Sequence, residues 1–169
     1  MNILETKRLV LRTINEKDFH SLYEEVFSNE EVVKFTFGKE LFTLEESKKF
    51  MKDNCNFDNK LGLSTLIEKD TKKIIGLAGV IECEYLNTID YEFGFILGEN
   101  YWGKGYAKEI GQAQIDFIKQ EIKTNRVLAL VDESNDASVK TIEKLGLSYL
   151  RSITTEGRGN RKVYFMEIE

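Results

Sequence analysis

Asn100-Tyr-Trp-Gly-Lys-Gly-Tyr-Ala-Lys-Glu-Ile110 is the most informative stretch of the sequence. An apolar run precedes it and a helical pattern follows it, so it should connect a strand to a helix. Gly103 and Gly105 let the backbone turn sharply and approach a ligand, since neither has a Cβ atom. The first N–H groups of the helix have no partner within it, and Lys104 and Lys108 add positive charge. The stretch therefore predicts a site for phosphate or diphosphate at the beginning of the helix.

Two other phosphate-binding loops fit this stretch less well. A P-loop requires Gly-Lys followed by Ser or Thr, whereas Gly105 is followed by Tyr106. A dinucleotide-binding loop requires Gly or Ala at the last position of Gly-x-Gly-x-x-Gly, and that position is Lys108. A strand–helix turn without any ligand fits the same residues equally well until a second motif is considered.

That second motif follows the next predicted strand. It consists of Asn135-Asp-Ala-Ser138 and, at the end of the helix, Lys144-Leu-Gly-Leu147. Together the two motifs resemble the GNAT superfamily of acetyl-CoA-dependent N-acyltransferases. The family motifs read Arg/Gln-x-x-Gly-x-Gly/Ala and Asn-x-x-Ser followed by a Lys-x-Gly-Phe-like run. The resemblance extends from about Leu4 to the C-terminus.

The first motif departs from the family pattern at one position. Trp102 stands where Arg or Gln is usual. The run Tyr-Trp-Gly-Lys-Gly-Tyr-Ala nevertheless looks like the branch that acetylates protein N-termini, including those of ribosomal proteins. The resemblance thus implies an amine acceptor, either a peptide or a small molecule, and leaves its identity open.

The resemblance also implies which residues bind acetyl-CoA. The backbone of the glycine loop would hold the diphosphate, and the strand before it would bond the pantetheine arm as an added strand does. Gly94 within that strand suggests a bulge or a close backbone approach, which would separate the strand from the next one and open a slot for the thioester. The matched cofactor-binding positions are Phe95, Ile96, Leu97, Trp102, Gly103, Lys104, Gly105, Tyr106, Ala107, Asn135 and Ser138.

Acyl transfer to an amine needs a general base, and Glu92 is the best candidate. It alternates with aromatic residues in an apolar strand. A half-buried carboxylate there lowers the stability of the fold unless it is paired, so an unpaired one suggests a functional role. Glu99 and Asp132, at strand ends, are weaker alternatives. A backbone N–H near Phe95 or Ile96 could stabilise the oxyanion.

The general acid is less clear from the sequence. Many relatives use a tyrosine seven residues after the motif asparagine, but that position is Ile142. Ser138 is the matched hydroxyl and becomes the candidate, although serine near a helix start commonly caps the helix. Asn135 has the same two interpretations.

The pattern of the whole chain predicts a mixed α/β fold. A strand is expected within residues 7–13, followed by a helix capped by Asn15, a short helix or turn over 31–37, and a helix from Thr43 to about Cys55. Strands over 63–68, 73–84 and 89–97 should form an antiparallel meander. A helix over 106–122, a strand over 126–131 and a helix over 136–145 imply one parallel strand pair, and strands over 147–154 and 162–168 close the chain. This is the GNAT arrangement: a mostly antiparallel sheet with flanking helices.

Composition narrows the class of protein. With 169 residues we expect one domain over 1–169, and the longest strongly apolar run, 74–81, is much shorter than the roughly twenty residues of a membrane span. The N-terminus has no signal-peptide layout, so we expect a cytoplasmic protein. A net charge of −5 argues against nucleic-acid binding. We expect no membrane partner, and by resemblance a homodimer is plausible.

The small number of histidines and cysteines excludes several kinds of site. His20 is the one histidine and Cys55 and Cys83 the two cysteines, too few for a zinc cluster or a disulfide framework, so we expect no metal. His20 lies in an expected helix, where a surface role is more common than a catalytic one. Two alternatives to an N-acetyltransferase stay open: a catalytically silent CoA-binding or sensor module of the same fold, and a nucleotide-binding protein.

Overall fold

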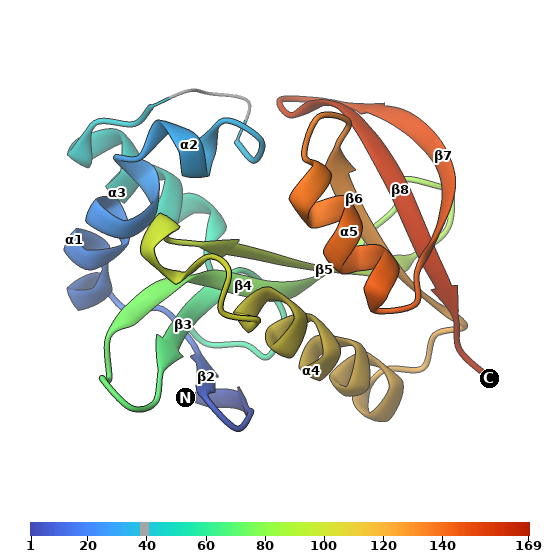
Figure 1. The fold of residues 1–169 in the computed structure, drawn as a ribbon, viewed down its shortest axis with the longest axis horizontal. Helices are drawn as coiled ribbons and strands as arrows, with labels where there is room; N and C mark the ends of the chain where they lie inside the picture. Colours follow the sequence, from blue (N-terminus) through green and yellow to red (C-terminus); the bar gives the residue numbers. More distant parts are fainter. Residues whose placement is uncertain (38–40) are drawn as a thin grey trace.

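The computed structural model describes residues 1–37 and 41–169, which form an eight-stranded sheet with helices on both faces (Figure 1). The strand order is β1-β2-β3-β4-β5-β6-β8-β7, and every neighbouring pair is antiparallel except β5 and β6. The strands are β1 (Asn2–Glu5), β2 (Leu9–Arg12), β3 (Ser64–Glu68), β4 (Ile74–Cys83), β5 (Asp90–Leu97), β6 (Arg126–Asp132), β7 (Ser148–Thr155) and β8 (Gly159–Glu167). The predicted fold class is confirmed.

The helices divide between the two faces. They are α1 (Phe19–Leu22), α2 (Glu30–Val33), α3 (Leu44–Asn54), α4 (Tyr106–Glu121) and α5 (Asp136–Lys144), with a π-helical turn at Tyr23–Phe27 after α1. Helices α1 to α3 lie at the left of Figure 1, and α4 and α5 lie side by side near its middle. Successive side chains of β5 point to opposite faces, so Phe93 packs in the core with α4 and α5, whereas Ile96 packs against α1 to α3.

Local signals in the sequence produce the helix ends. Asn15 and Thr43 each form a capping box, the first with Asp18 and the second with Glu46. Helix α5 stops where Gly146 takes a φ of 101°, a conformation that glycine adopts without strain. The predicted caps are therefore confirmed.

Three elements differ from the sequence-based expectation. Strand β1 was not expected, because its four residues pair only with β2 and carry little apolar pattern. The π-helical turn was not expected either. Strand β8 begins at Gly159 rather than at Lys162, because pairing with β7 extends as far as Thr155↔Gly159, to the edge of the turn.

Strands β5 and β6 separate soon after they meet. Their only register pair within the described residues is Glu92↔Leu128, and α4 forms the crossover that makes this pair parallel. The pairing of β4 with β5 continues without a shift through Gly79↔Gly94, so the bulge considered at Gly94 is not present on that side. A Cβ atom at Gly94 would meet nothing within 4 Å. We call the space between β5 and β6 beyond Glu92 the gap.

None of the helices in the described ranges, 1–37 and 41–169, is long and apolar enough to cross a membrane.

Candidate active site

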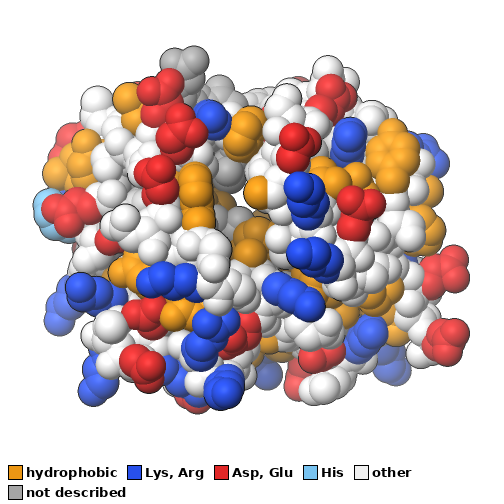
Figure 2. Space-filling model, in the orientation of Figure 1, with side chains coloured by type: hydrophobic (Ala, Val, Ile, Leu, Met, Phe, Trp, Pro, Cys, Tyr) orange, Lys and Arg blue, Asp and Glu red, His pale blue; other side chains and the backbone are white. Residues whose placement is uncertain are grey.

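A cleft of about 550 Å³ opens at the carboxyl end of β5. Its walls come from three places: the end of β5 with the following loop, the first turn of α4 together with α5, and α2 with the segment that follows it. Figure 2 shows a hollow at the centre of this face, with hydrophobic side chains on its walls and lysine and arginine side chains gathered nearby. Lys34, Lys108 and Lys144 are among the lining residues. A cleft with apolar walls and a positive rim suits an apolar arm that ends in phosphates.

The glycine loop is built to present N–H groups. Gly103 and Gly105 have φ values of 75° and 82°, which only glycine adopts readily. Helix α4 starts directly after Gly105 and has no side-chain cap. Within the described part of the chain, the N–H groups of residues 103–108 donate to no protein acceptor. Together with the positive end of a 16-residue helix, they fit a diphosphate.

Trp102 takes a specific role at the position where the family usually has Arg or Gln. Its indole Nε1–H donates to the Leu97 carbonyl oxygen at 2.9 Å, which ties the loop back to the end of β5. The side chain is 46% exposed and lines the cleft, so its ring remains available to a ligand. Lys104 lies with its Nζ 5.4 Å from the centre of the Tyr101 ring.

The three predicted strand positions do not face the same way. The Gly98 N–H donates to the Ile75 carbonyl, and the β4–β5 register therefore directs the main-chain groups of Ile96 toward β4 as well. The main-chain groups of Phe95 and Leu97 point to the opposite edge, into the gap. The main-chain groups of Phe95 and the Leu97 N–H can thus bond an inserted arm, since the Leu97 carbonyl already accepts from Trp102. Ile96 cannot do so through its backbone.

Asn135 and Ser138 both line the cleft, but Asn135 is also the N-cap of α5. Its Oδ1 accepts from the Ser138 N–H at 3.2 Å. The capping role that the sequence left open is therefore present for Asn135. The Ser138 hydroxyl has no protein partner in the described residues and remains free for a ligand.

Glu92 lies beside the gap and is 5% exposed. Its Oε1 is 3.8 Å from Arg158 Nη2, and its Oε2 has no hydrogen-bond partner in the described residues. Burial raises the pKa of the Glu92 carboxyl, and the neighbouring Arg158 only partly offsets this. Glu92 is not among the residues that line the cleft. It projects from the face of β5 opposite Phe93, the same face as Ile96.

The two weaker carboxylate candidates are already engaged. Glu99 accepts from Asn29 Nδ2 at 3.0 Å, and Asp132 accepts from the Ser134 N–H at 2.8 Å. Neither carboxylate is buried.

Two polar groups near the gap are absent from the candidates that the sequence suggests. The Tyr85 hydroxyl accepts from Arg158 Nη2 at 2.9 Å, next to Glu92. Gln114 on α4 is fully buried and donates to the Gly94 carbonyl at 3.1 Å, while its Oε1 has no partner in the described residues. Only Gln114 carried a signal, because a polar residue four positions from both Ile110 and Ile118 lies on the apolar side of the helix.

The comparisons with known proteins agree with this geometry. A family model of the acetyltransferase (GNAT) domain matches residues 8–148. The relative named uncharacterized N-acetyltransferase YnaD, from Bacillus subtilis (strain 168), is 30% identical over 144 residues, which are 85% of this chain and 81% of YnaD.

Solved structures show the same fold. A GNAT-family acetyltransferase from Bacillus anthracis has a TM-score of 0.81 at 23% identity, covering 99% of this chain and 98% of its own. RimL, a ribosomal-protein α-N-acetyltransferase in complex with coenzyme A, has a TM-score of 0.75 at 15% identity, covering 99% and 98%. The matched family model spans most of the sequence and contains both motifs, and the chain therefore belongs to the GNAT acetyltransferase family.

Proposed function

We propose that residues 1–169 form one enzyme domain that transfers an acetyl group from acetyl-CoA to a primary amine, by direct attack in a ternary complex. The observation that carries the proposal is the glycine loop, whose unpartnered N–H groups open onto the cleft beside the free edge of β5. Membership of the GNAT family supports the same reaction. Acetyl-CoA supplies the activated thioester, and no metal is required.

The loop and the strand edge would hold and orient the carrier. The N–H groups of Gly103 to Lys108 face the diphosphate, and the Phe95 carbonyl and the Leu97 N–H bond the pantetheine arm. The Phe95 N–H, which points into the gap, donates to the oxyanion that forms when the amine attacks. Holding both substrates in line accounts for a large part of the rate.

Glu92 and Ser138 would move the protons. The amine nitrogen bonds to the carbonyl carbon, the carbon–sulfur bond breaks, and the amine gives its proton to Glu92. The Ser138 hydroxyl donates a proton to the departing thiolate and regains one from water, while Glu92 later releases the amine proton to water. A base with a raised pKa is suited to this task near neutral pH.

The acceptor would enter between the segment after α2 and the turn before β8. Val32, Phe35 and Thr36 form a mostly apolar wall of the cleft. We favour a peptide N-terminus, because the run around Trp102 resembles the branch that acetylates such termini and because RimL has a similar fold. A small amine is the alternative acceptor.

The direct test is a thiol-release assay with acetyl-CoA and a panel of peptides, polyamines, aminoglycosides and amino acids. We expect release with at least one peptide class. In the variant with both Gly103→Val and Gly105→Val, the affinity for CoA should fall at least about tenfold, because valine resists positive φ. Tight CoA binding without thiol release from any amine would instead favour the silent CoA-binding module. Unchanged CoA affinity in the glycine variant, or displacement of CoA by ATP, would contradict the proposed loop.

A further inference from the structure

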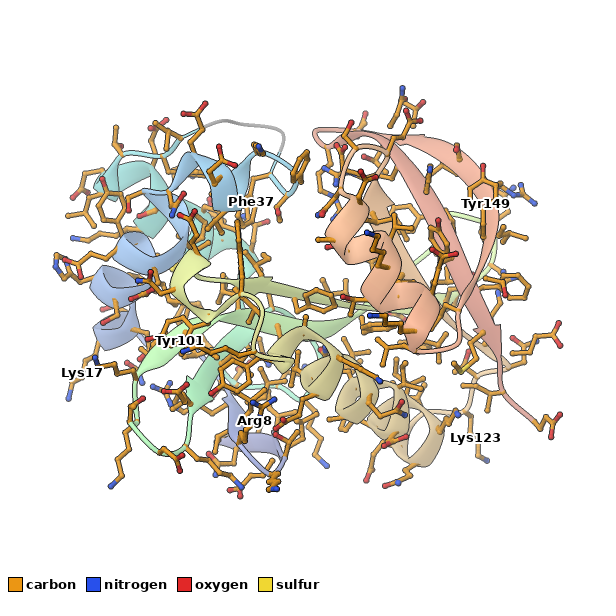
Figure 3. The ribbon with its side chains drawn as sticks, in the orientation of Figure 1. Arg8, Lys17, Phe37, Tyr101, Lys123 and Tyr149 are labelled. Atoms are coloured by element: carbon orange, nitrogen blue, oxygen red, sulfur yellow. The ribbon has the colours of Figure 1, made fainter. Side chains whose placement is uncertain are left out.

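Arg8 holds the glycine loop from outside the cleft. It immediately precedes β2 and lies beside the beginning of α4 in Figure 3. Its Nη1 donates to the Lys104 carbonyl oxygen at 2.8 Å, and its guanidinium lies 4.3 Å from the centre of the Tyr106 ring. Two residues of the loop motif are thus contacted by one side chain that does not itself line the cleft.

The bond to the Lys104 carbonyl fixes the direction of an N–H group. The Lys104 carbonyl and the Gly105 N–H belong to one planar trans peptide unit, in which the two groups point in opposite directions. When Arg8 binds the carbonyl, the Gly105 N–H must point away from Arg8. Gly105 separates Arg8 from the cleft, since a Cβ atom there would lie 3.3 Å from Arg8 Nη2 while Gly105 also lines the cleft.

Glu109 in turn holds Arg8 in place. Its Oε1 accepts from Arg8 Nε at 2.7 Å, and its Oε2 accepts from the Arg8 N–H at 2.9 Å and from the Thr6 hydroxyl. Burial alone would raise the pKa of Glu109, but the bonds from Thr6 and Arg8 outweigh it and lower the pKa. A charged Glu109 in the first turn of α4 therefore orients the guanidinium toward the loop.

The loop is anchored from a second side as well. The Tyr106 hydroxyl donates to Glu68 at the end of β3, and Glu68 also accepts from the Thr71 hydroxyl at 2.7 Å. The Tyr106 ring is therefore held at its hydroxyl by Glu68 and covered on its face by Arg8. This double restraint keeps the first residue of α4 in one orientation.

We propose that Arg8, held by Glu109, is a positioning residue that aims the N–H groups of the glycine loop at the diphosphate of the acyl carrier. The proposal rests on the proposed function, because it requires that this loop binds a diphosphate. A donor that is aimed before the ligand arrives avoids the cost of ordering the loop on binding.

The test compares carriers with and without a diphosphate. We expect Arg8→Ala to weaken the binding of CoA, measured by calorimetry, about tenfold, and to raise the KM for acetyl-CoA by a similar factor. The KM for S-acetylpantetheine, which lacks the diphosphate, should stay within twofold of the original protein. Arg8→Lys should give an intermediate loss, because an ammonium cannot bind Glu109 and the Lys104 carbonyl with one planar fork.

The matched control is Arg151→Ala, which removes an exposed arginine that has no contact with the loop. It should leave both carriers unaffected. A melting curve for each variant distinguishes a protein that no longer folds from one that folds but has a misoriented glycine loop. Arg8 is not a positioning residue if the folded Arg8→Ala protein binds CoA as tightly as the original protein. The same holds if the KM values for acetyl-CoA and S-acetylpantetheine rise by equal factors. If the original protein binds no CoA at all, the proposed function fails instead.

Discussion

At the scale of single residues, Glu92 combines two properties that rarely occur together. It is buried, and one of its carboxylate oxygens has no hydrogen-bond partner in the described residues. An unsatisfied buried carboxylate oxygen destabilises the fold by an amount of order 1–3 kcal/mol or more. A residue retained at such a cost fits the role of the general base.

Glu92→Gln should lower kcat about 10²-fold or more, the usual contribution of a general base, without changing CoA affinity. Because the base must be ionised, the activity of the original protein should fall as the pH drops through the raised pKa of Glu92. This acid limb should be missing from the residual activity of Glu92→Gln. A variant with full kcat and an unaltered pH profile would show that Glu92 is not the base.

The same substitution should change stability with a defined sign. A carboxyl with a raised pKa binds its proton more tightly in the folded chain, so stability falls as the pH rises from the unfolded pKa through the folded one. Glutamine does not titrate. Chemical denaturation should therefore show Glu92→Gln gaining stability relative to the original protein as the pH increases through that window.

At the scale of elements, the junction of β5 with β6 is secured by one ion pair. Arg126 binds Asp90 with two hydrogen bonds, Nε to Oδ1 at 2.7 Å and Nη2 to Oδ2 at 3.0 Å. Asp90 is 1% exposed, and it lies two residues before the register pair Glu92↔Leu128. The pair thus holds the two strands together at the closed end of the gap.

Removing Arg126 alone should lower the free energy of unfolding more than removing both Arg126 and Asp90. Arg126→Ala leaves a buried carboxylate without its counter-charge and should lower the free energy of unfolding by about 3 kcal/mol. The double variant Arg126→Ala with Asp90→Ala should recover part of that loss in urea denaturation. A double variant that is no more stable than Arg126→Ala would contradict the prediction that the unpaired, buried Asp90 carboxylate is the main source of the loss.

At the scale of the whole molecule, Arg161 connects the C-terminal hairpin to the segment after α2, which forms one wall of the cleft. It lies on β8, is 4% exposed, and donates to the carbonyl oxygens of Phe35 and Thr36 after α2. Burial, with the neighbouring charge of Arg158, lowers the pKa of Arg161. The wall of the cleft formed by residues 32–36 therefore depends on a strand more than 120 positions away.

Arg161→Lys should lower stability by about 2 kcal/mol, because one ammonium cannot serve both carbonyls in the same plane. Hydrogen exchange of the amides in residues 32–37 should become faster, and the KM for the amine acceptor should rise. The control Arg151→Ala should show neither change. Unaltered exchange in residues 32–37 would contradict the connecting role of Arg161.

The features that could be predicted from the sequence are those with local causes. The capping box at Thr43, the stop at Gly146 and the paired glycines before α4 each lie within a few residues of the structure that they determine. The contact of Arg8 with Glu109 joins residues 101 positions apart, and no local sequence pattern predicts it. The orientation of Glu92 depends in the same way on Arg158, which arrives from another hairpin.

The short pairing between β5 and β6 has a consequence for the stability of the protein. Strands β1 to β5 form one plate and β6 to β8 another, joined along a short line. A molecule that bridges both edges binds only the assembled form, so the free energy of unfolding must rise with its concentration as RT ln(1 + [L]/Kd). The protein should therefore melt at its lowest temperature without such a ligand, and the melting temperature should rise as the space between the plates fills.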